Sequence, residues 1–313
     1  QYKHAIVDAA EALRLYSYLF LPYAVRAGAN LILKKYKQAI VDAEEAIRLA
    51  PKALFPHRIR LNAYYMLGDL EAMNAACDQT IQAHPEWEPA YTFRAEAYVH
   101  MGDYAKAIED CNQAIKLAPE SEYAALVRAQ VLLLAFRTTK FREACAEMLE
   151  RFGQSEDPKG FCTAARACAL APNAVADPMA PVELAKRAVS QSLMAPYLRQ
   201  WMVYTLGMAH LRAGQPDEAV ERFHESFDAD PGWRAITLIW LGLALAEQHR
   251  GNTPEARRRF AQAIELMERD PGIAPQDRLE AQILRREVEA LLAGAEEDTP
   301  EKEKEAPQED QDA

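Results

Sequence analysis

EPAYTFRAEAYVHMGDYAKAIEDCNQAIKLAPES, residues Glu88 to Ser121, is one unit of a pattern that recurs every 34 residues in the first half of the chain. The segment Tyr36–Leu49 restates Tyr2–Leu15 with three differences, and Tyr104–Leu117 restates it again two steps later. Single residues keep the same step, among them Arg26, Arg60, Arg94 and Arg128, Cys77 and Cys111, and Pro51, Pro85 and Pro119. An internal period of about 20 to 50 residues indicates an array of stacked structural units.

Each unit reads as two helices joined by a tight turn. Pro89–Met101 carries small and apolar residues at helical spacing, Gly102-Asp103 interrupts it, and Tyr104–Leu117 is a second amphipathic helix. Pro119 then ends the second helix. Because one hairpin cannot bury its apolar stripe alone, neighbouring hairpins stack into a continuous core. The pattern predicts an all-α fold, an α-solenoid of stacked antiparallel helix hairpins.

The order of bulky and small residues within the unit resembles the tetratricopeptide repeat (TPR). The matching residues are Tyr91, Ala95, Tyr98, Gly102-Asp103-Tyr104, Ala107, Cys111, Ala114 and Pro119. The resemblance spans Phe20 to Ser121 and implies a TPR superhelix that binds other proteins. Within it, Asn30 and Lys34-Lys35 replace the usual Tyr and Gly-Asp, and Met73 and Thr80 replace alanines.

The period divides the chain into segments. Residues 1–19 read as the second helix of a truncated repeat, so the chain is expected to be a fragment; its apolar face, Ala5 to Leu13, is expected to be exposed or to pair with a missing helix. The N-terminal array covers residues 20–153, in units 20–53, 54–87, 88–121 and 122–153. In the fourth unit a longer turn, Arg137 to Lys140, is expected to shift Phe141 and Ala144 about three residues late.

The C-terminal half is less regular. Residues 154–199 are expected to form a diverged helical unit, with helices at Phe161–Leu170 and Pro181–Gln191. Regular units return in residues 200–293 and end with a capping helix, Asp277–Leu292, whose Glu280, Arg285, Arg286, Glu287 and Glu289 are expected on its outer surface. Residues 294–313 are expected to be a disordered acidic tail.

Charge and composition narrow the classes of partner. The formal net charge is −11, but residues 295–313 hold nine acidic side chains against Lys302 and Lys304, so −7 of it lies in the tail. The nearly balanced body argues against nucleic acid as a partner. The apolar runs are too short to span a membrane, and the odd number of cysteines without a CxxC pair predicts buried free thiols. A cytoplasmic location is expected.

Motifs of catalysis are not found in the sequence. It has no Gly-rich phosphate loop, no His-Glu-x-x-His, no G-x-S-x-G and no kinase signature. The histidines never pair at metal-ligand spacing. The sequence therefore predicts a non-catalytic chain without cofactor or metal.

Binding in the groove is the remaining function. In stacked hairpins the first helices line the concave surface, and their residues that face away from the second helix are candidate contacts for a peptide or helix of another protein. These candidates are Phe55, Arg58, Asn62, Tyr65, Thr92, Glu96, His100, Tyr123, Gln130, Trp201, Tyr204 and Arg212. The alternative for each residue is that it packs between units. The repeated Arg26, Arg60, Arg94 and Arg128 likewise read either as a basic ladder or as a repeated structural bond.

The resemblance also limits the choice of partner. Some TPR proteins hold the C-terminal carboxylates of heat-shock chaperones through a Lys and Asn, then an Asn, then a Lys and Arg on successive first helices. Arg58 and Asn62 fit the first part, but Phe93, Tyr123 and Val127 occupy the other places. This disfavours chaperone-tail binding and favours an apolar or mixed ligand.

Two alternatives remain open. The C-terminal half, including Trp240–Ala244 and Leu284–Leu292, is similar to the repeat regions of planctomycete Ser/Thr protein kinase or WD-repeat proteins. That resemblance implies a regulatory or substrate-recruiting region of a larger kinase. The other alternative is self-association through the open N-terminal face.

Overall fold

The computed structural model describes residues 2–191, 198–229, 235–269 and 275–297, and within these ranges it contains sixteen α-helices and no strand. The N-terminal half consists of α1 (Tyr2–Leu15), α2 (Phe20–Ile32), α3 (Tyr36–Leu49), α4 (Leu54–Leu67), α5 (Leu70–Ala83), α6 (Glu88–His100), α7 (Tyr104–Leu117), α8 (Glu122–Leu134) and α9 (Thr138–Phe152). The C-terminal half consists of α10 (Pro158–Cys168), α11 (Met179–Ser190), α12 (Arg199–Arg212), α13 (Pro216–Ala229), α14 (Ile236–His249), α15 (Thr253–Arg269) and α16 (Pro275–Glu297). The predicted all-α solenoid is confirmed.

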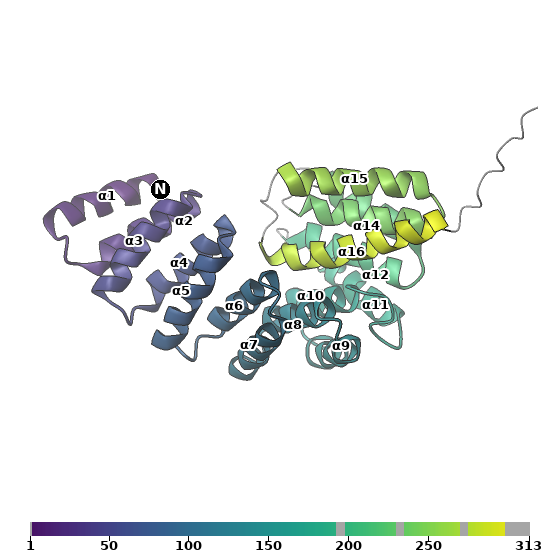
Figure 1. Cartoon of the computed structure of the whole chain (residues 1–313), viewed down its shortest axis with the longest axis horizontal. Helices are drawn as coiled ribbons and strands as arrows, with labels where there is room; N and C mark the ends of the chain where they lie inside the picture. Colours follow the sequence, from purple (N-terminus) through teal and green to yellow (C-terminus); the bar gives the residue numbers. More distant parts are fainter. Residues whose placement is uncertain (1, 192–197, 230–234, 270–274, 298–313) are drawn as a thin grey trace, which may run out of the picture.

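The helices follow one another around an arc (Figure 1). The even-numbered helices α2 to α14 contact each other in succession and form its inner layer, while the odd-numbered helices cover the outside. We call the surface of this inner layer the groove.

The turns inside the hairpins keep the 34-residue step through the fourth unit. Lys34, Gly68, Gly102 and Phe136 all have a left-handed backbone, with φ of 59°, 72°, 77° and 56°. The helix α9 begins at Thr138, one full step after Tyr104 begins α7. The expected three-residue shift of Phe141 and Ala144 is therefore wrong: Phe141 occupies the place of Ala107, and Cys145 occupies the place of Cys111.

The recurring arginines are structural. Arg26 forms two hydrogen bonds to Asp42, at 2.9 and 2.6 Å, and Arg94 forms the same pair with Asp110, at 2.8 and 2.7 Å. Each bond joins the two helices of one hairpin. Arg60 and Arg128 likewise join the two helices of their own hairpins, through Gln79 and Glu147 respectively. These side chains lie between helices and do not form a basic ladder. Most of their bonds join the two helices of one hairpin.

The five cysteines are free thiols and all are buried, as predicted. Cys77, Cys111 and Cys145 repeat at the 34-residue step and have exposed fractions of 0%, 1% and 0%. Burial raises the pKa of the Cys77, Cys111 and Cys162 thiols, that of Cys162 to about 11. They therefore serve as small core residues.

The first helix does not leave its apolar face open. Ala9 and Leu13 are buried, and α1 packs on α2. The expectation that this face is exposed or waits for a missing helix is wrong for these two residues, because α2 already covers them. Large side chains on the other faces, such as Val7 and Leu15, are exposed.

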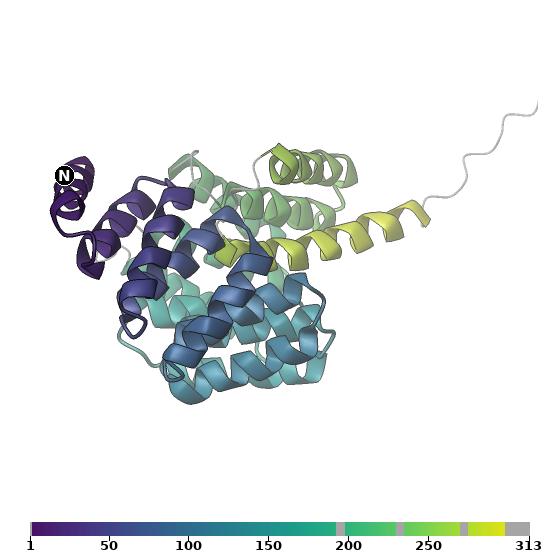
Figure 2. The same ribbon diagram turned by 60° about the vertical axis from the view of Figure 1, so that its left-hand side comes forward.

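The last helix differs most from expectation. It starts two residues earlier than predicted and continues through Glu297, so the first residues of the expected tail, 294–297, are helical; residues 298–313 lie outside the described ranges. It runs along the inside of the arc (Figure 1), with its N-terminal end at the centre of the molecule (Figure 2). It contacts α14, α15 and also α8, far away in the sequence.

The side chains of α16 belong to two cores. Leu279 and Ile283 join the cluster formed by α6, α7, α8, α9 and α10, whereas Leu284 and Val288 join the cluster of α12 to α15. Glu280, expected on the outer surface, is 1% exposed. The helix α16 therefore does more than cap the end of the array with a polar surface: it packs into the groove and contacts both halves of the molecule.

Candidate functional site

The structure divides the predicted groove residues into a covered and an open set. Tyr65, Thr92, Glu96, Gln130 and Tyr204 are buried, with exposed fractions of 5% or less. The side chain of Arg212 is 7% exposed. The expectation that these six are free to meet a ligand is wrong for this structure. For Tyr204 and Arg212 the reason is direct, because both bind acidic residues of α16.

Three of the candidates are exposed at the N-terminal part of the groove and in its centre. Phe55, Arg58 and His100 are exposed, and Asn62 is half-buried. The Arg58 guanidinium lies 5.4 Å from the centre of the Phe55 ring, and the Asn62 side-chain amide donates to the Arg58 carbonyl at 2.8 Å. Phe55 and Arg58 form a cation–π pair on a surface that remains open to solvent.

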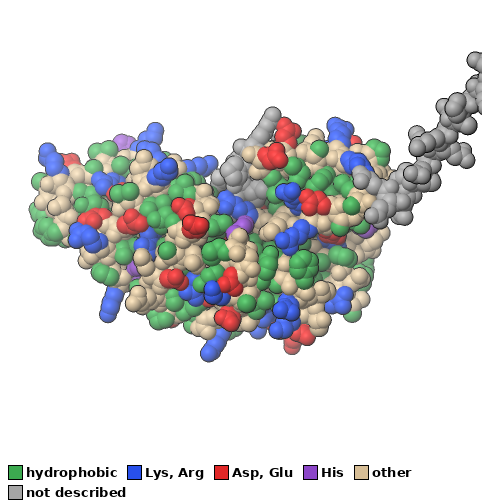
Figure 3. Space-filling view, in the orientation of Figure 1, with side chains coloured by type: hydrophobic (Ala, Val, Ile, Leu, Met, Phe, Trp, Pro, Cys, Tyr) green, Lys and Arg blue, Asp and Glu red, His purple; other side chains and the backbone are tan. Residues whose placement is uncertain are grey.

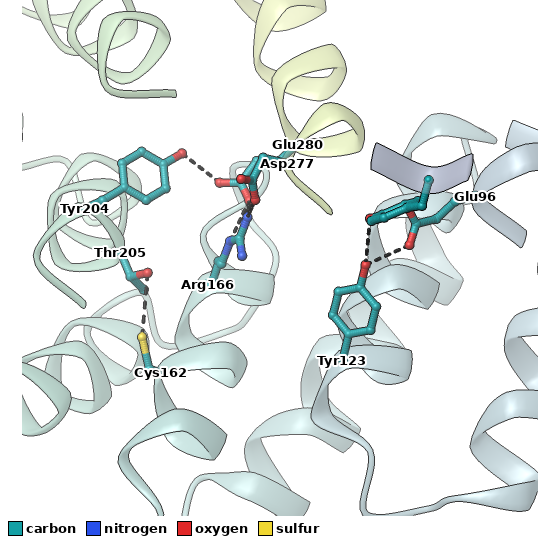
Figure 4. A network of polar contacts seen from close by, with 9 residues as sticks. Glu96, Tyr123, Cys162, Arg166, Tyr204, Thr205, Asp277 and Glu280 are labelled. Atoms are coloured by element: carbon teal, nitrogen blue, oxygen red, sulfur yellow. Dashed lines mark hydrogen bonds and ion pairs between the residues drawn. The ribbon is translucent and has the colours of Figure 1, made fainter. Parts of the chain in front are cut away.

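A buried carboxyl lies where three first helices meet. The Tyr123 hydroxyl of α8 donates to Glu96 Oε1 of α6 at 2.7 Å, and the Tyr65 hydroxyl of α4 lies 3.1 Å from that of Tyr123 (Figure 4). Desolvation raises the pKa of Glu96 to about 7. Arg278 of α16 interacts electrostatically with Tyr65 and Glu96. The Tyr–Tyr–Glu contacts therefore fix the groove floor beneath the N-terminal turn of α16.

A second polar cluster surrounds Arg166 of α10 (Figure 4). Its Nε donates to Glu280 at 2.7 Å and its Nη2 to Asp277 at 3.2 Å, both on α16. The Tyr204 hydroxyl donates to the other oxygen of Glu280 at 2.7 Å. On the opposite side, the Arg166 guanidinium lies 4.0 Å from the centre of a Trp201 ring. Burial raises the pKa of Asp277 to about 7, although Arg166 opposes that shift.

Arg212 of α12 is held on two sides. It forms a bidentate pair with Glu287 of α16, at 2.5 and 2.7 Å. It also donates to the backbone carbonyls of Ala169 and Leu170, at 3.0 Å each. These carbonyls follow the end of α10, so Arg212 connects the groove floor to α16.

A cavity of about 310 Å³ remains in the groove beside these contacts. It lies between α8, α10 and α12, and its walls are mainly apolar. The lining residues are Glu122, Tyr123, Leu126, Lys159, Cys162, Thr163, Arg166, Leu198, Trp201, Met202 and Thr205. Two predicted residues, Tyr123 and Trp201, are among them. An ion pair between Lys159 and Glu122 lies at this site.

The α10 residues of the cavity were not predicted. Residues 154–199 do not follow the 34-residue period, so the sequence does not show which face of α10 points into the groove. The helix begins at Pro158, three residues before the predicted start, with Asp157 accepting from the Lys159 amide as its N-cap. That Asp-Pro pair was the available signal for the helix start and hence for its inward face.

Charge on the surface is mixed. On the face drawn in Figure 3, acidic and basic side chains intermingle over both halves, without a broad stripe of one sign. None of the described helices combines the length and the apolar character needed to span a membrane.

Comparisons with known proteins agree with the fold. Residues 89–121 and residues 204–274 match two family models, each described as tetratricopeptide repeat. No curated protein sequence matches the chain. Together with the fold, these segments place the chain among the helical-repeat solenoids. Both matched segments carry tetratricopeptide repeats. The kinase or WD-repeat resemblance of the C-terminal half stays a prediction.

Solved structures of TPR proteins share the architecture. The chain is similar to yeast Tom70, with a TM-score of 0.56 and 16% identity over 95% of this chain and 62% of that one. It is also similar to a chain of the APC/C hetero-tetramer Cut9–Hcn1, with a TM-score of 0.54 and 11% identity over 92% of this chain. A tetratricopeptide repeat protein from Parabacteroides merdae gives 0.54 and 12%, over 83% of this chain and 98% of that one. The chain spans 52% of the Cut9–Hcn1 chain, and the likeness concerns the fold alone.

Proposed function

We propose that this chain is a non-catalytic scaffold that binds a peptide or helix of another protein in its groove. The cavity between α8, α10 and α12 is the observation that carries the proposal. It opens on the layer of first helices and combines Trp201 and Tyr123 with the cationic Arg166. Aromatic and Arg side chains in a partly desolvated pocket are typical of residues that dominate protein–protein affinity.

The size of the cavity indicates what part of a partner it takes. Its volume of about 310 Å³ is at the small end of the range for binding pockets, about 300–1,000 Å³. We therefore expect it to hold one large apolar side chain of the ligand, while the rest of the ligand follows the groove. Phe55, Arg58 and Asn62 provide further contacts toward the N-terminal end.

The proposal is tested by filling the cavity. Peptides are selected on the chain from a display library, and their affinities are then measured for Thr163→Trp. Thr163 lines the cavity on α10 and is only partly buried, so a larger side chain enters the cavity without burying a new polar group. We expect the affinity to fall roughly thirtyfold, about 2 kcal/mol.

The matched control is Thr139→Trp. Thr139 is an exposed residue of α9 outside the cavity, so the same change there should leave the affinity unaltered. Equal affinities for both variants and the unchanged chain would show that the cavity is not the binding site.

The N-terminal contacts are tested separately with Phe55→Ala combined with Arg58→Ala. Both side chains are exposed, so the fold should be preserved, which circular dichroism checks. If the ligand extends along the groove, this variant binds the selected peptides more weakly, and the loss adds to that of Thr163→Trp because the sites are separate.

A further inference from the structure

The helix that occupies the groove carries an ordered set of carboxylates. Asp277 and Glu280 lie one turn apart and meet Arg166, and Glu287, two turns further along α16, meets Arg212. Leu284 and Val288 lie on the same helix in the apolar core with α12 and α14. The face of α16 toward the groove is therefore an amphipathic surface with acidic residues at i, i+3 and i+10.

The two arginines also have contacts outside α16. Arg166 lies against Trp201, a neighbour on α12, and Arg212 is held by the carbonyls of Ala169 and Leu170. The body of the array thus presents two oriented guanidinium groups to the groove. Oriented guanidinium groups bind carboxylates with high geometric selectivity.

We propose that the groove recognises an amphipathic helix with an acidic face, and that α16 is a built-in occupant which a partner's helix of the same pattern replaces. The proposal rests on the function proposed above and specifies its ligand. The occupant to which it commits is a helix of another protein with carboxylates at i, i+3 and i+10 and apolar residues between them.

The N-terminal turn of α16 is the part best suited to release. Asp277 is 1% exposed, yet its Oδ2 atom has no hydrogen-bond partner among the described residues. Asp277 and Glu280 share the one guanidinium of Arg166. A buried carboxylate with an unsatisfied oxygen reduces the net gain from docking, because desolvation opposes the attraction. A helix of another protein can compete with this turn of α16 if its carboxylates form more hydrogen bonds or stay in contact with solvent.

A tethered occupant also sets the apparent affinity of the groove. Because α16 belongs to the same chain, it competes at an effective concentration on the order of millimolar. The apparent affinity of a ligand for the unaltered chain is therefore lower than its affinity for the same groove without α16. The factor is the fraction of molecules in which α16 has left the groove.

The experiment adds α16 as a separate peptide. A labelled peptide of residues 275–297 is titrated, with fluorescence anisotropy, into the unaltered full chain and into a full chain with Asp277→Asn, Glu280→Gln and Glu287→Gln. The variant's own helix lacks the carboxylates that meet Arg166 and Arg212, whereas the added peptide supplies them. We expect the peptide to bind the variant at least about tenfold more tightly than the unaltered chain.

Two controls isolate the acidic face. A peptide with the same three substitutions should lose the tenfold preference. A chain with Glu289→Gln should behave like the unaltered chain, because Glu289 is exposed and pairs with Arg285 of the same helix. Equal binding of the acidic and the neutral peptide would overturn the proposal.

Hydrogen exchange on the unaltered chain provides a test that needs no variant. We expect the amides of α16 to exchange through local opening, faster than those of α14, its neighbour in the core. Exchange of α16 only together with α14, through global unfolding, would overturn the proposal and make α16 a permanent part of the array. Exchange of α16 between copies, seen as a dimer, would overturn it too, because the occupant would then be a second copy.

The two proposals fail in different ways. Peptides selected on the chain that are sensitive to Thr163→Trp but have no acidic face, and do not compete with peptide 275–297, would support the scaffold and overturn the acidic-helix ligand. Selected peptides that are insensitive to Thr163→Trp but compete with peptide 275–297 would support the acidic-helix site and remove the cavity from it.

Discussion

The two halves of the chain use the same hairpin with different bonds. In the N-terminal half, Arg94 binds Asp110 across 16 residues of sequence, and Arg26 binds Asp42 across the same separation. In the C-terminal half, Arg166 binds Glu280 across 114 residues, and Arg212 binds Glu287 across 75. The first half is therefore stabilised by local contacts that repeat, and the second by distant contacts that occur once.

The halves also fill the hairpin interior differently. Ala95 lies seven residues before the left-handed Gly102, and Cys111 lies nine residues after it; both are buried in one cluster. In the same places around the left-handed Gly214 are Gly207 and Phe223. The second half thus has one glycine and one fully buried ring where the first half has two small residues. The ring takes the space that a Cβ atom at Gly207 would need, because such an atom would lie 2.8 Å from it.

The largest expected effect contrasts the two kinds of ion pair. Arg166→Met should lower the free energy of unfolding by about 3–5 kcal/mol, because it leaves the buried Asp277 and Glu280 without their cation. Arg94→Met should lower it by about 1 kcal/mol, because the Arg94 side chain is 19% exposed and its second partner, Asp78, is 55% exposed. Urea denaturation measures both. Equal losses would remove the distinction between the halves.

The next effect tests the packing of Phe223. A Cβ atom at Gly242 would lie 2.6 Å from the Phe223 ring, which is fully buried, so Gly242→Ala should destabilise the chain by about 1–3 kcal/mol. Gly294→Ala is the matched control in α16. Nothing lies within 4 Å of a Cβ there, so alanine should be neutral or should stabilise the helix by up to about 1 kcal/mol. Thermal unfolding of the two variants decides between crowding and helix propensity.

The regular half was predictable because its contacts are local. The step of Arg26, Arg94 and the cysteines follows from a unit that repeats its own interior, so the hairpins could be derived from residues 88–121 alone. The predicted three-residue shift of the fourth unit is wrong for two reasons. Phe141 is a large residue at the place where Ala107 is small, and the turn has Phe136 at the place of a glycine.

The occupied groove could not be predicted in the same way. Glu280 has the spacing of an exposed residue on a capping helix, and its partners Arg166 and Tyr204 lie in other units. No local pattern links residues more than seventy positions apart. Tyr123 and Trp201 were found because they follow the period, whereas Cys162 and Thr163 of the cavity do not.

The pKa values of two buried carboxyl groups provide a third comparison: Glu96 lies on α6 in the N-terminal half, and Asp277 lies on α16 in the C-terminal half. Burial raises the pKa of Glu96 and of Asp277 to about 7, so between pH 6 and 8 the folded chain holds protons that the unfolded chain has lost. The contribution of these two carboxyls to the free energy of unfolding should therefore decrease as the pH rises from 6 to 8, by about 1 kcal/mol for each. Desolvation lowers the pKa of His57 and His100, which acts in the opposite direction, so the carboxyl contribution is the difference between the unaltered chain and a variant without these two groups. Urea titrations at both pH values measure the difference.

The combination of Glu96→Gln with Asp277→Asn should remove the carboxyl contribution, since neither replacement titrates. An equal pH dependence of this variant and of the unaltered chain would contradict the assignment of the two protons.

The smallest effect concerns the hairpin turns. Gly102→Ala should destabilise the N-terminal half by about 1 kcal/mol, because Gly102 has φ of 77° and nothing within 4 Å of a Cβ, so only backbone strain changes. Lys34→Gly at the equivalent turn should stabilise it by up to about 0.5–1 kcal/mol, since Lys34 is exposed at φ of 59°. Changes of the same sign in both variants would show that the turns are not equivalent.

The position of α16 also has a consequence during synthesis on the ribosome. The helices α6 and α8, on which its N-terminal end packs, are complete once residue 134 has been made, but α16 begins only at residue 275. At a translation rate of about 5–20 residues per second, the interval lasts on the order of ten seconds. During that interval the nascent array can fold domain by domain with its inner surface unoccupied. A helix of another protein can reach that surface during that interval without competition from α16.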